Sequence, residues 1–418
     1  MAAALPAVMV FLAVLTIPLS AAPSLGLSTG QLSSWVFALY AGPGILGLWL
    51  AIRHHQPLVL TGNVFAIILF ASEARHVSFP ALAGASVVAG AAVAALGVAG
   101  LTRRLTRLVP PPIVVGLLAG AVLPFVVRLF TNVGQDPLVV GGALAGYLLG
   151  RRFLSSVTPL LPALVVGVTL AAATGKLGLP PTFSLPQLAV TLPTFSVEAL
   201  VTVTPIVIAI MVLQANLPSL VFLRSQGYDP PEREIDLVSG VGTVALSFLG
   251  PNAVSVPLPI MPLVAGPECG ASDRRVRAAT AAGIALIVIG LFAGVAVGLV
   301  TFLPGPLVQG LAGLALLGVL ATSLKQVVAG PLVLGPLVAF VVVQSSLTLL
   351  GLGPFFWALV LGVAVSRLLE PGELRALGGA PPVENRAFVS RELEASELAD
   401  ATAGPSINET ERPSGPQA

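Results

Sequence analysis

Long apolar runs dominate the chain from residue 5 to residue 369, and only short polar or Gly/Pro-rich breaks separate them. A helix needs about 20 mostly apolar residues to cross a bilayer. Only 9% of the 418 residues are charged, whereas soluble domains carry about 25%. We therefore predict an all-α polytopic membrane protein with fourteen transmembrane segments. They lie near residues 5–24, 32–52, 57–72, 79–101, 112–130, 137–150, 157–174, 199–222, 235–250, 251–266, 278–301, 306–324, 331–350 and 353–369.

The placement of positive charge gives this topology an orientation. With the N-terminus inside, 17 of the 20 Lys and Arg residues fall on the cytoplasmic side, and only Arg75, Arg128 and Lys176 fall outside. Positive loops stay cytoplasmic, which predicts that both termini are inside. The expected location is the bacterial inner (plasma) membrane. Residues 371–418 lack apolar periodicity and are predicted to form a disordered cytoplasmic tail. A cleaved signal peptide at residues 1–26 is disfavoured because this segment has no positively charged start.

Two short matches indicate an internal repeat. Pro-Ser-Leu occurs at residue 23 and again at residue 218, which are 195 residues apart. PIVVGL begins at Pro112 and PLVQGL begins at Pro306, which are 194 residues apart. A common offset predicts two seven-span halves, residues 1–198 and 199–370. Because seven is odd, the second half enters the membrane from the other side, so the repeat is inverted.

Spans 3 and 10 are partners in this repeat, and both are broken. Span 3 carries Thr-Gly-Asn at 61–63, and span 10 reads GPNAVSVPLPIMP from residue 250. Proline cannot continue a helix, so each span is predicted to be a short extended stretch followed by a half-helix. We expect Thr61 or Asn63 to cap the first half-helix, and Ser255 to cap the second with Pro257 in its first turn. Two facing helix N-termini near the membrane midplane would suit an anion.

Span 8 adds two amides, Gln214 and Asn216, deep in an apolar segment. Buried amides need partners, which are either neighbouring helices or a bound ligand. The middle of each predicted span lacks Asp, Glu, Lys, Arg and His, so the carboxylate that usually relays protons is not visible in the sequence. The same absence and the single cysteine, Cys269, disfavour a membrane enzyme, a metal site and a cofactor.

Span 8 and the turn after it resemble the benzoate:proton symporter (BenE) family. The similar stretch is QANLPSLVFLRSQGYDPP at residues 214–231, and Ala265–Glu268 and Pro112 also fit. The resemblance covers residues 5–369 and implies the fold of the uracil/xanthine and sulfate permeases. In that fold spans 1–4 and 8–11 form a core domain, and spans 5–7 and 12–14 form a gate domain. The substrate site that it implies comprises Thr61, Asn63, Gln214, Asn216 and Ser255.

The resemblance implies a secondary active transporter that imports benzoate or a similar aromatic carboxylate with protons. Nucleobase permeases of the same fold place acidic residues in spans 8 and 10, which this chain does not, so an anion is favoured over a nucleobase. An uncoupled channel or uniporter, for an inorganic anion such as sulfate, remains the alternative. The expected partners are the anionic substrate, protons and the lipid bilayer, but not nucleic acid. The oligomeric state is left open, with a homodimer as one form to test.

Overall fold

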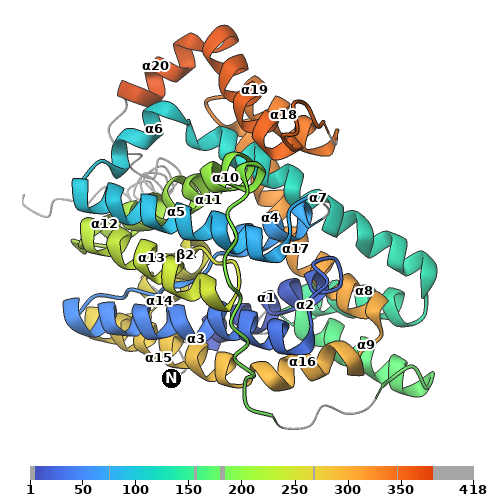
Figure 1. Ribbon diagram of the computed structural model, residues 1–418. Helices are drawn as coiled ribbons and strands as arrows, with labels where there is room; N and C mark the ends of the chain where they lie inside the picture. The colour runs from blue at the N-terminus through green and yellow to red at the C-terminus, as the bar shows by residue number, and fades with distance from the viewer. Residues whose placement is uncertain are drawn as a thin grey trace, which may run out of the picture. The chain divides into compact units, whose positions relative to one another are not determined.

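The computed structural model describes residues 5–74, 76–154, 158–178, 184–266, 269–345 and 347–379. One compact unit extends to Gly378 and is built mainly from α-helices (Figure 1). The prediction of a helical protein is therefore confirmed. The described residues also contain one two-stranded sheet, which joins the two predicted broken segments.

The elements of the first half follow the predicted order of apolar segments. They are α1 (Leu5–Val14), α2 (Thr16–Ala21), α3 (Thr29–His54), β1 (Thr61–Gly62), α4 (Val64–Glu73), α5 (Phe79–Ala99), the 3₁₀ turn η2 (Thr102–Arg104), α6 (Leu105–Leu108), α7 (Pro111–Gln135), α8 (Val139–Phe153) and α9 (Leu160–Ala173).

The second half begins after an extended linker. Its elements are α10 (Val197–Thr202), α11 (Thr204–Ala209), the π-helical segment η3 (Ile210–Asn216), α12 (Leu217–Ser225), α13 (Glu232–Leu246), the 3₁₀ turn η4 (Ser247–Leu249), β2 (Val254–Ser255), the 3₁₀ turn η5 (Leu258–Ile260), α14 (Met261–Ala265), α15 (Ser272–Leu291), α16 (Ala293–Phe302), α17 (Gly305–Ala329), α18 (Leu334–Gln344), α19 (Pro354–Leu369) and α20 (Pro371–Gly379).

The lengths of these helices test the membrane prediction only in part. Among the described residues, five helices are long and apolar enough to cross a membrane, counting Val197–Ser225 as one. The number rises to seven if two bent pairs, which begin at Ser272 and Pro354, each form one span. The chain thus has membrane-spanning character, and the count of fourteen crossings stays a prediction.

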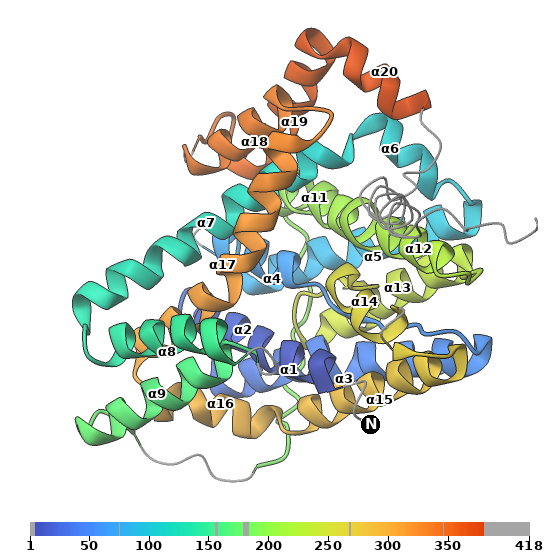
Figure 2. The ribbon, with the colours of Figure 1, turned by 180° about the vertical axis from the view of Figure 1, so that it is seen from behind.

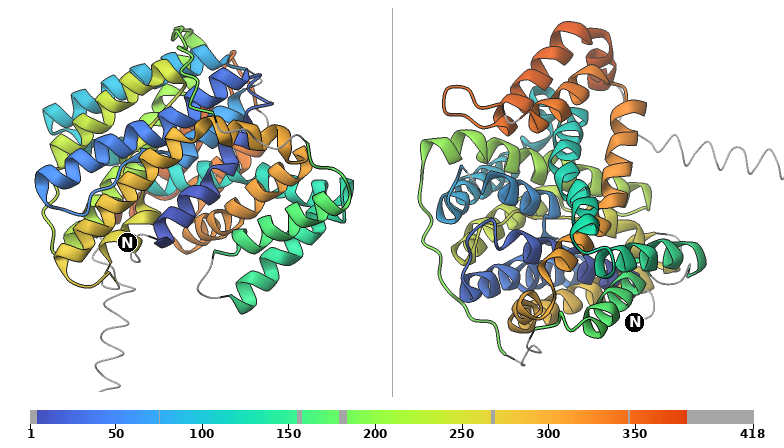
Figure 3. Two further views of the ribbon diagram at one scale, coloured as in Figure 1. Left: turned by 90° about the horizontal axis from the view of Figure 1, so that it is seen from below. Right: turned by 90° about the vertical axis from the view of Figure 1, so that its right-hand side faces the viewer.

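Three helix pairs form the framework of the unit. α3 packs along α15, α5 along α13, and α7 along α17 (Figures 1 and 3). Small residues permit the closest of these approaches: a Cβ placed on Gly240 of α13 would lie 2.5 Å from the Gly90 carbonyl oxygen of α5. There are two further helix pairs: α8 packs against α9, and α18 packs against α19 (Figure 2).

The linker before α10 runs as an extended segment without regular secondary structure and passes over α3 and the start of α5 (Figure 1). The Ser34 hydroxyl of α3 donates to the Gln187 carbonyl at 2.8 Å. Farther along, the Thr191 N–H donates to the Phe248 carbonyl at 2.7 Å and the Thr194 N–H to the Pro80 carbonyl at 3.0 Å. These bonds satisfy linker backbone groups that no regular element would pair.

The two-stranded sheet lies where the chain breaks its helices. β1 and β2 pair antiparallel, with Thr61 opposite Ser255 and Gly62 opposite Val254. The Asn63 N–H extends the ladder by donating to the Ala253 carbonyl at 2.9 Å. Because the strands run in opposite directions, the helices that follow them leave the sheet in opposite directions as well.

The predicted tail begins with a helix. α20 (Pro371–Gly379) occupies the first nine residues of the segment assigned to the disordered tail, so that part of the prediction is wrong. Proline is accepted in the first turn of a helix, and Glu373, Leu374 and Ala376 are all good helix formers. The remainder of the predicted tail, residues 380–418, lies outside the described residues.

Candidate functional site

Asn63 sits at the junction between β1 and α4. Its backbone is extended (φ −73°, ψ 122°), and its Oδ1 accepts from the Phe65 N–H at 2.9 Å. This bond satisfies one of the N–H groups that the first turn of a helix leaves without a partner. The prediction that Asn63 caps the half-helix is confirmed.

The other side of the Asn63 amide reaches across the sheet. Its Nδ2 donates to the Ser255 Oγ at 3.0 Å, and both side chains are buried. Thr61, opposite Ser255 in the register, is partly buried. The structure therefore brings Thr61, Asn63 and Ser255 together although nearly 200 residues of chain separate them.

Ser255 does not cap the second half-helix, so that prediction is wrong. Ser255 belongs to β2, the helical turn η5 starts at Leu258 with Pro257 before it, and α14 starts only at Met261. Pro257 contributes to the delay, because proline restricts the residue before it, Val256, to extended conformations. Pro257 thus precedes the first turn instead of lying in it.

Asn216 is fully buried and joins three elements. Its Nδ2 donates to Asp236 Oδ1 at 2.9 Å and lies 3.4 Å from Ser239 Oγ, both on α13. Its Oδ1 accepts from the Val256 N–H at 2.9 Å, directly after β2. The amide therefore holds the extended part of the second broken segment against α13.

Gln214 lies two residues earlier, within the π-helical segment η3. Its Oε1 is buried and has no hydrogen-bond partner among the residues that the structure describes. η3 packs against both β2 and α7, so it lies between the sheet and a helix of the predicted gate. An acceptor left unsatisfied in a buried place is costly, and π-helical segments occur frequently at functional sites.

Further polar side chains hold β2 in place, and the sequence analysis did not assign them. The Thr243 hydroxyl accepts from the Val254 N–H at 2.8 Å, and the Ser219 hydroxyl donates to the Val256 carbonyl at 3.0 Å. The Asn252 amide donates to the Ala38 carbonyl of α3 at 2.7 Å. Ser219 belongs to the repeated Pro-Ser-Leu motif, and Asn252 belongs to the second broken segment. Membership of these motifs is the sequence feature that could have identified both residues.

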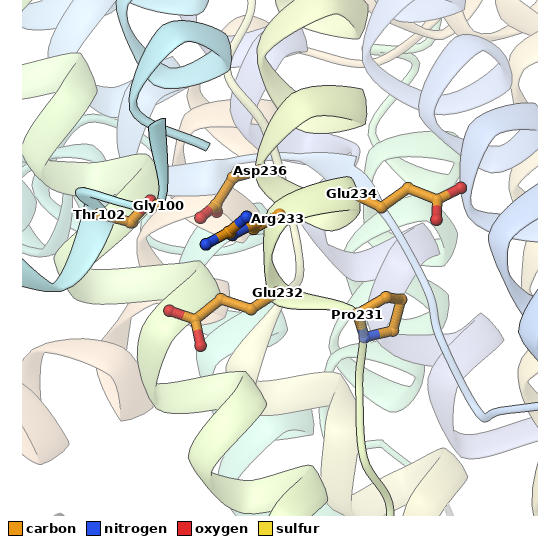
Figure 4. Close-up of a pocket in the computed structure, with 7 residues that line it drawn as sticks. All are labelled: Gly100, Thr102, Pro231, Glu232, Arg233, Glu234 and Asp236. Atoms are coloured by element: carbon orange, nitrogen blue, oxygen red, sulfur yellow. The ribbon is translucent and has the colours of Figure 1, made fainter. Parts of the chain in front are cut away.

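A cavity of about 510 Å³ lies at the start of α13 (Figure 4). Its lining residues are Gly100, Thr102, Pro231, Glu232, Arg233, Glu234 and Asp236. None of the five predicted site residues is among them, but Asp236 bonds directly to Asn216. Asp236 is the second residue of a predicted span, and the sequence analysis overlooked this acid. The described part of the chain contains no cluster of three His, Cys, Asp or Glu residues that would hold a metal ion.

A family model and a curated relative both point to benzoate membrane transport proteins. Residues 1–368 match the family model described as benzoate membrane transport protein (BenE). A benzoate membrane transport protein of Acinetobacter baylyi is 28% identical over 355 residues, which cover 84% of this chain and 90% of that protein. The inner membrane protein YdcO of Escherichia coli is 27% identical over 341 residues, covering 81% and 87%.

Solved structures resemble the chain more distantly. The murine anion transporter Slc26a9 in its inward-facing state aligns with a TM-score of 0.48 and 15% identity, over 87% of this chain and 68% of that one. The transmembrane domain of the cyanobacterial bicarbonate transporter BicA aligns with a TM-score of 0.47 and 15% identity, over 86% and 97%.

Proposed function

The chain belongs to the benzoate membrane transport protein (BenE) family, and from this membership we propose that it imports a small organic anion together with protons. The family is one of membrane transporters and not of enzymes. The proposed substrate is benzoate or a similar aromatic carboxylate. The name of the Acinetobacter relative supports this substrate class.

The observation that carries the proposal is the unsatisfied Oε1 of Gln214 beside the paired broken segments. We propose that the substrate carboxyl group binds between Gln214 and the first turn of α4. A protonated carboxyl would donate its O–H to the Gln214 oxygen, and its carbonyl oxygen would accept from the N–H groups that the first turn of α4 leaves without partners. α14 has only five residues, so its dipole contributes less.

The remaining predicted residues have supporting roles in this proposal. Asn63, Ser255 and Asn216 are already hydrogen-bonded to one another or to the backbone around β1 and β2. They would fix the two extended segments so that the site is preformed, and Thr61 would line it from β1. Preformed polar groups bind a ligand more tightly because less ordering is required on binding.

We also propose fourteen spans arranged as two inverted halves, residues 1–198 and 199–370, with both termini cytoplasmic. Three packing features support the repeat. When the halves are exchanged, the pair α3 with α15 becomes the pair α13 with α5. In the same way, α8 with α9 becomes α18 with α19. The strand β1 pairs with its own counterpart, β2. A bacterial inner membrane fits the printed name of the Escherichia coli relative.

Transport is tested with purified protein in liposomes and radiolabelled benzoate. Uptake should saturate with benzoate concentration and increase when the outside is made acidic. Gln214→Ala should lower uptake by about 5–150-fold, the equivalent of losing about 1–3 kcal/mol of polar interaction. Gln226→Ala is the matched control, because this amide lies at the exposed end of α12.

Three results would contradict parts of the proposal. Absence of uptake for benzoate and related acids would remove the substrate class. Uptake that ignores the pH gradient would remove proton coupling, and currents that do not saturate would favour the channel alternative. Equal uptake by Gln214→Ala and wild type would remove the site.

A further inference from the structure

Asp236 is a buried acid that the proposed binding site does not use. It lies in the second turn of α13 and is 1% exposed. Its Oδ1 accepts from the Asn216 amide at 2.9 Å, whereas its Oδ2 is buried and has no hydrogen-bond partner within the described residues. A buried carboxylate without a compensating cation is costly and takes up a proton instead.

The neighbouring acids of α13 are in a different situation. Glu232 pairs with Arg224 of α12 at 2.9 Å, and Glu234 pairs with Arg53 at 2.9 Å and with His54 at 3.0 Å, both on α3. Asp236 has no ion pair among the described residues, although the side chain of Arg233 lines the same cavity (Figure 4). Of these three acids, Asp236 alone has no positive partner to keep it ionised.

The cavity at the start of α13 brings water close to this acid, although the Oδ2 atom itself is covered. Figure 4 shows the Asp236 carboxylate pointing toward Gly100 and Thr102, next to the side chain of Arg233. Gly100 and Arg233 are exposed, so the cavity of about 510 Å³ reaches the protein surface. A single water occupies about 30 Å³ of liquid, so the cavity has room for a chain of waters. On the proposed topology it opens to the cytoplasm.

Two hydrogen bonds connect Asp236 to the broken segment of the second half. Asp236 Oδ1 holds the Nδ2 of Asn216, and the Oδ1 of the same amide holds the Val256 N–H directly after β2. A charged acceptor makes a stronger hydrogen bond than a neutral one. A change of charge on Asp236 therefore alters the bond that orients Asn216, and through it the position of β2.

We propose that Asp236 binds a coupled proton, in addition to the one on the substrate carboxyl group, and exchanges it with water in this cavity. This inference rests on the proposed function, proton-coupled import of an organic anion. A hydronium from the outside becomes water as the Oδ2–H bond forms; after a movement opens Oδ2 to the cavity, a water molecule there accepts the proton on the cytoplasmic side. Asn216 is then a positioning residue that transmits the protonation state to the substrate site. The charged groups around Asp236 are Glu232, Arg233 and Glu234 on α13, and Arg224 on α12.

Asp236→Asn tests this role, because it keeps the shape of the side chain and mimics the protonated state. In liposomes, the uptake driven by an acidic exterior should be at least about tenfold lower for this variant than for the wild type. A change of this size is within the usual range of coupling between sites. Exchange of benzoate across the membrane at equal pH should persist and lose its pH dependence. Asp273→Asn is the matched control, since Asp273 is exposed at the start of α15 and pairs with Arg277.

The outcomes separate this inference from the proposed function. Full gradient-driven uptake by Asp236→Asn would overturn the role of Asp236 while leaving the transporter proposal intact; the proton on the substrate carboxyl group would then be the only coupled one. Absence of uptake by the wild type would overturn the proposed function itself. If Asp236→Asn does not fold, Asp236→Glu provides the test: it should retain coupled uptake with a shifted pH dependence, and an unshifted profile would overturn the inference.

Discussion

At the scale of single residues, Asn63 combines a structural bond with a place beside the proposed substrate. Its Oδ1 caps α4 and its Nδ2 bonds Ser255 across the sheet. The sequence narrowed the cap of this helix to Thr61 or Asn63, and the structure shows that it is Asn63. The partner of the other half of the amide could not be predicted, because it depends on a strand register between residues 192 positions apart.

Asn63→Asp separates the two roles of this side chain. Aspartate is as good an N-cap as asparagine, and the Ser255 hydroxyl and the N-terminus of α4 partly offset its buried charge, so the unfolding temperature should fall less than in Asn63→Ala. Its negative charge should repel an anion, and the benzoate KM should rise at least about tenfold, equivalent to 1.4 kcal/mol. Asn63→Ala should instead lower the unfolding temperature, because the cap is lost at a cost of about 0.5–2 kcal/mol. A KM for Asn63→Asp equal to that of the wild type would contradict the placement of the substrate here.

At the scale of elements, the second broken segment depends on the glycine that opens it. Gly250 has φ 138°, a conformation that side chains rarely adopt. A Cβ there would lie 2.7 Å from Trp35 Cδ1 and 3.0 Å from Phe79 Cζ, and the Trp35 indole N–H donates to the Pro251 carbonyl at 2.8 Å. The turn into the extended segment is therefore fixed by α3 and α5 together.

Gly250→Ala should lower the stability of the purified protein by about 1–3 kcal/mol, because strain and overlap both oppose the new methyl group. Thermal unfolding in detergent measures the change. Gly134→Ala is the control: this helical glycine has open space around it, and alanine is the better helix former by about 1 kcal/mol. Equal unfolding temperatures for Gly250→Ala and the wild type would show that the turn tolerates a side chain.

The elements also show where sequence reasoning ended. Prolines in the second broken segment predicted an interrupted helix, but their combined effect placed the helix start at Met261, beyond the expected Ser255 cap. The π-helical segment η3 packs against β2 and α7. The residue pattern of its sequence, IMVLQAN, does not predict a π-helix.

At the scale of the whole molecule, the proposed mechanism requires the core elements to move against the gate elements. Ser20 of α2, in the proposed core, and Gln309 of α17, in the proposed gate, line the same narrow gap, which has no room for a water molecule. A link between these two positions should stop transport. A link within the gate should not, because α8 and α9 would move as one body.

Paired cysteines test this movement after Cys269→Ser removes the native thiol. Ser20→Cys with Gln309→Cys, joined by a reducible thiol cross-linker, should lose most uptake and regain it on reduction. Ala143→Cys with Gly167→Cys is the control, because their Cβ positions lie 3.2 Å apart between α8 and α9. Undiminished transport by the first linked pair would contradict movement at this boundary.

The central claim is that the substrate binds where the two broken segments meet. Hydrogen–deuterium exchange of the full chain in lipid nanodiscs, with and without benzoate, tests it most directly. The account predicts slower exchange in peptides covering residues 58–70, 210–218 and 253–262 when benzoate is present. Protection confined to other segments, in a preparation that transports benzoate, would contradict the claim.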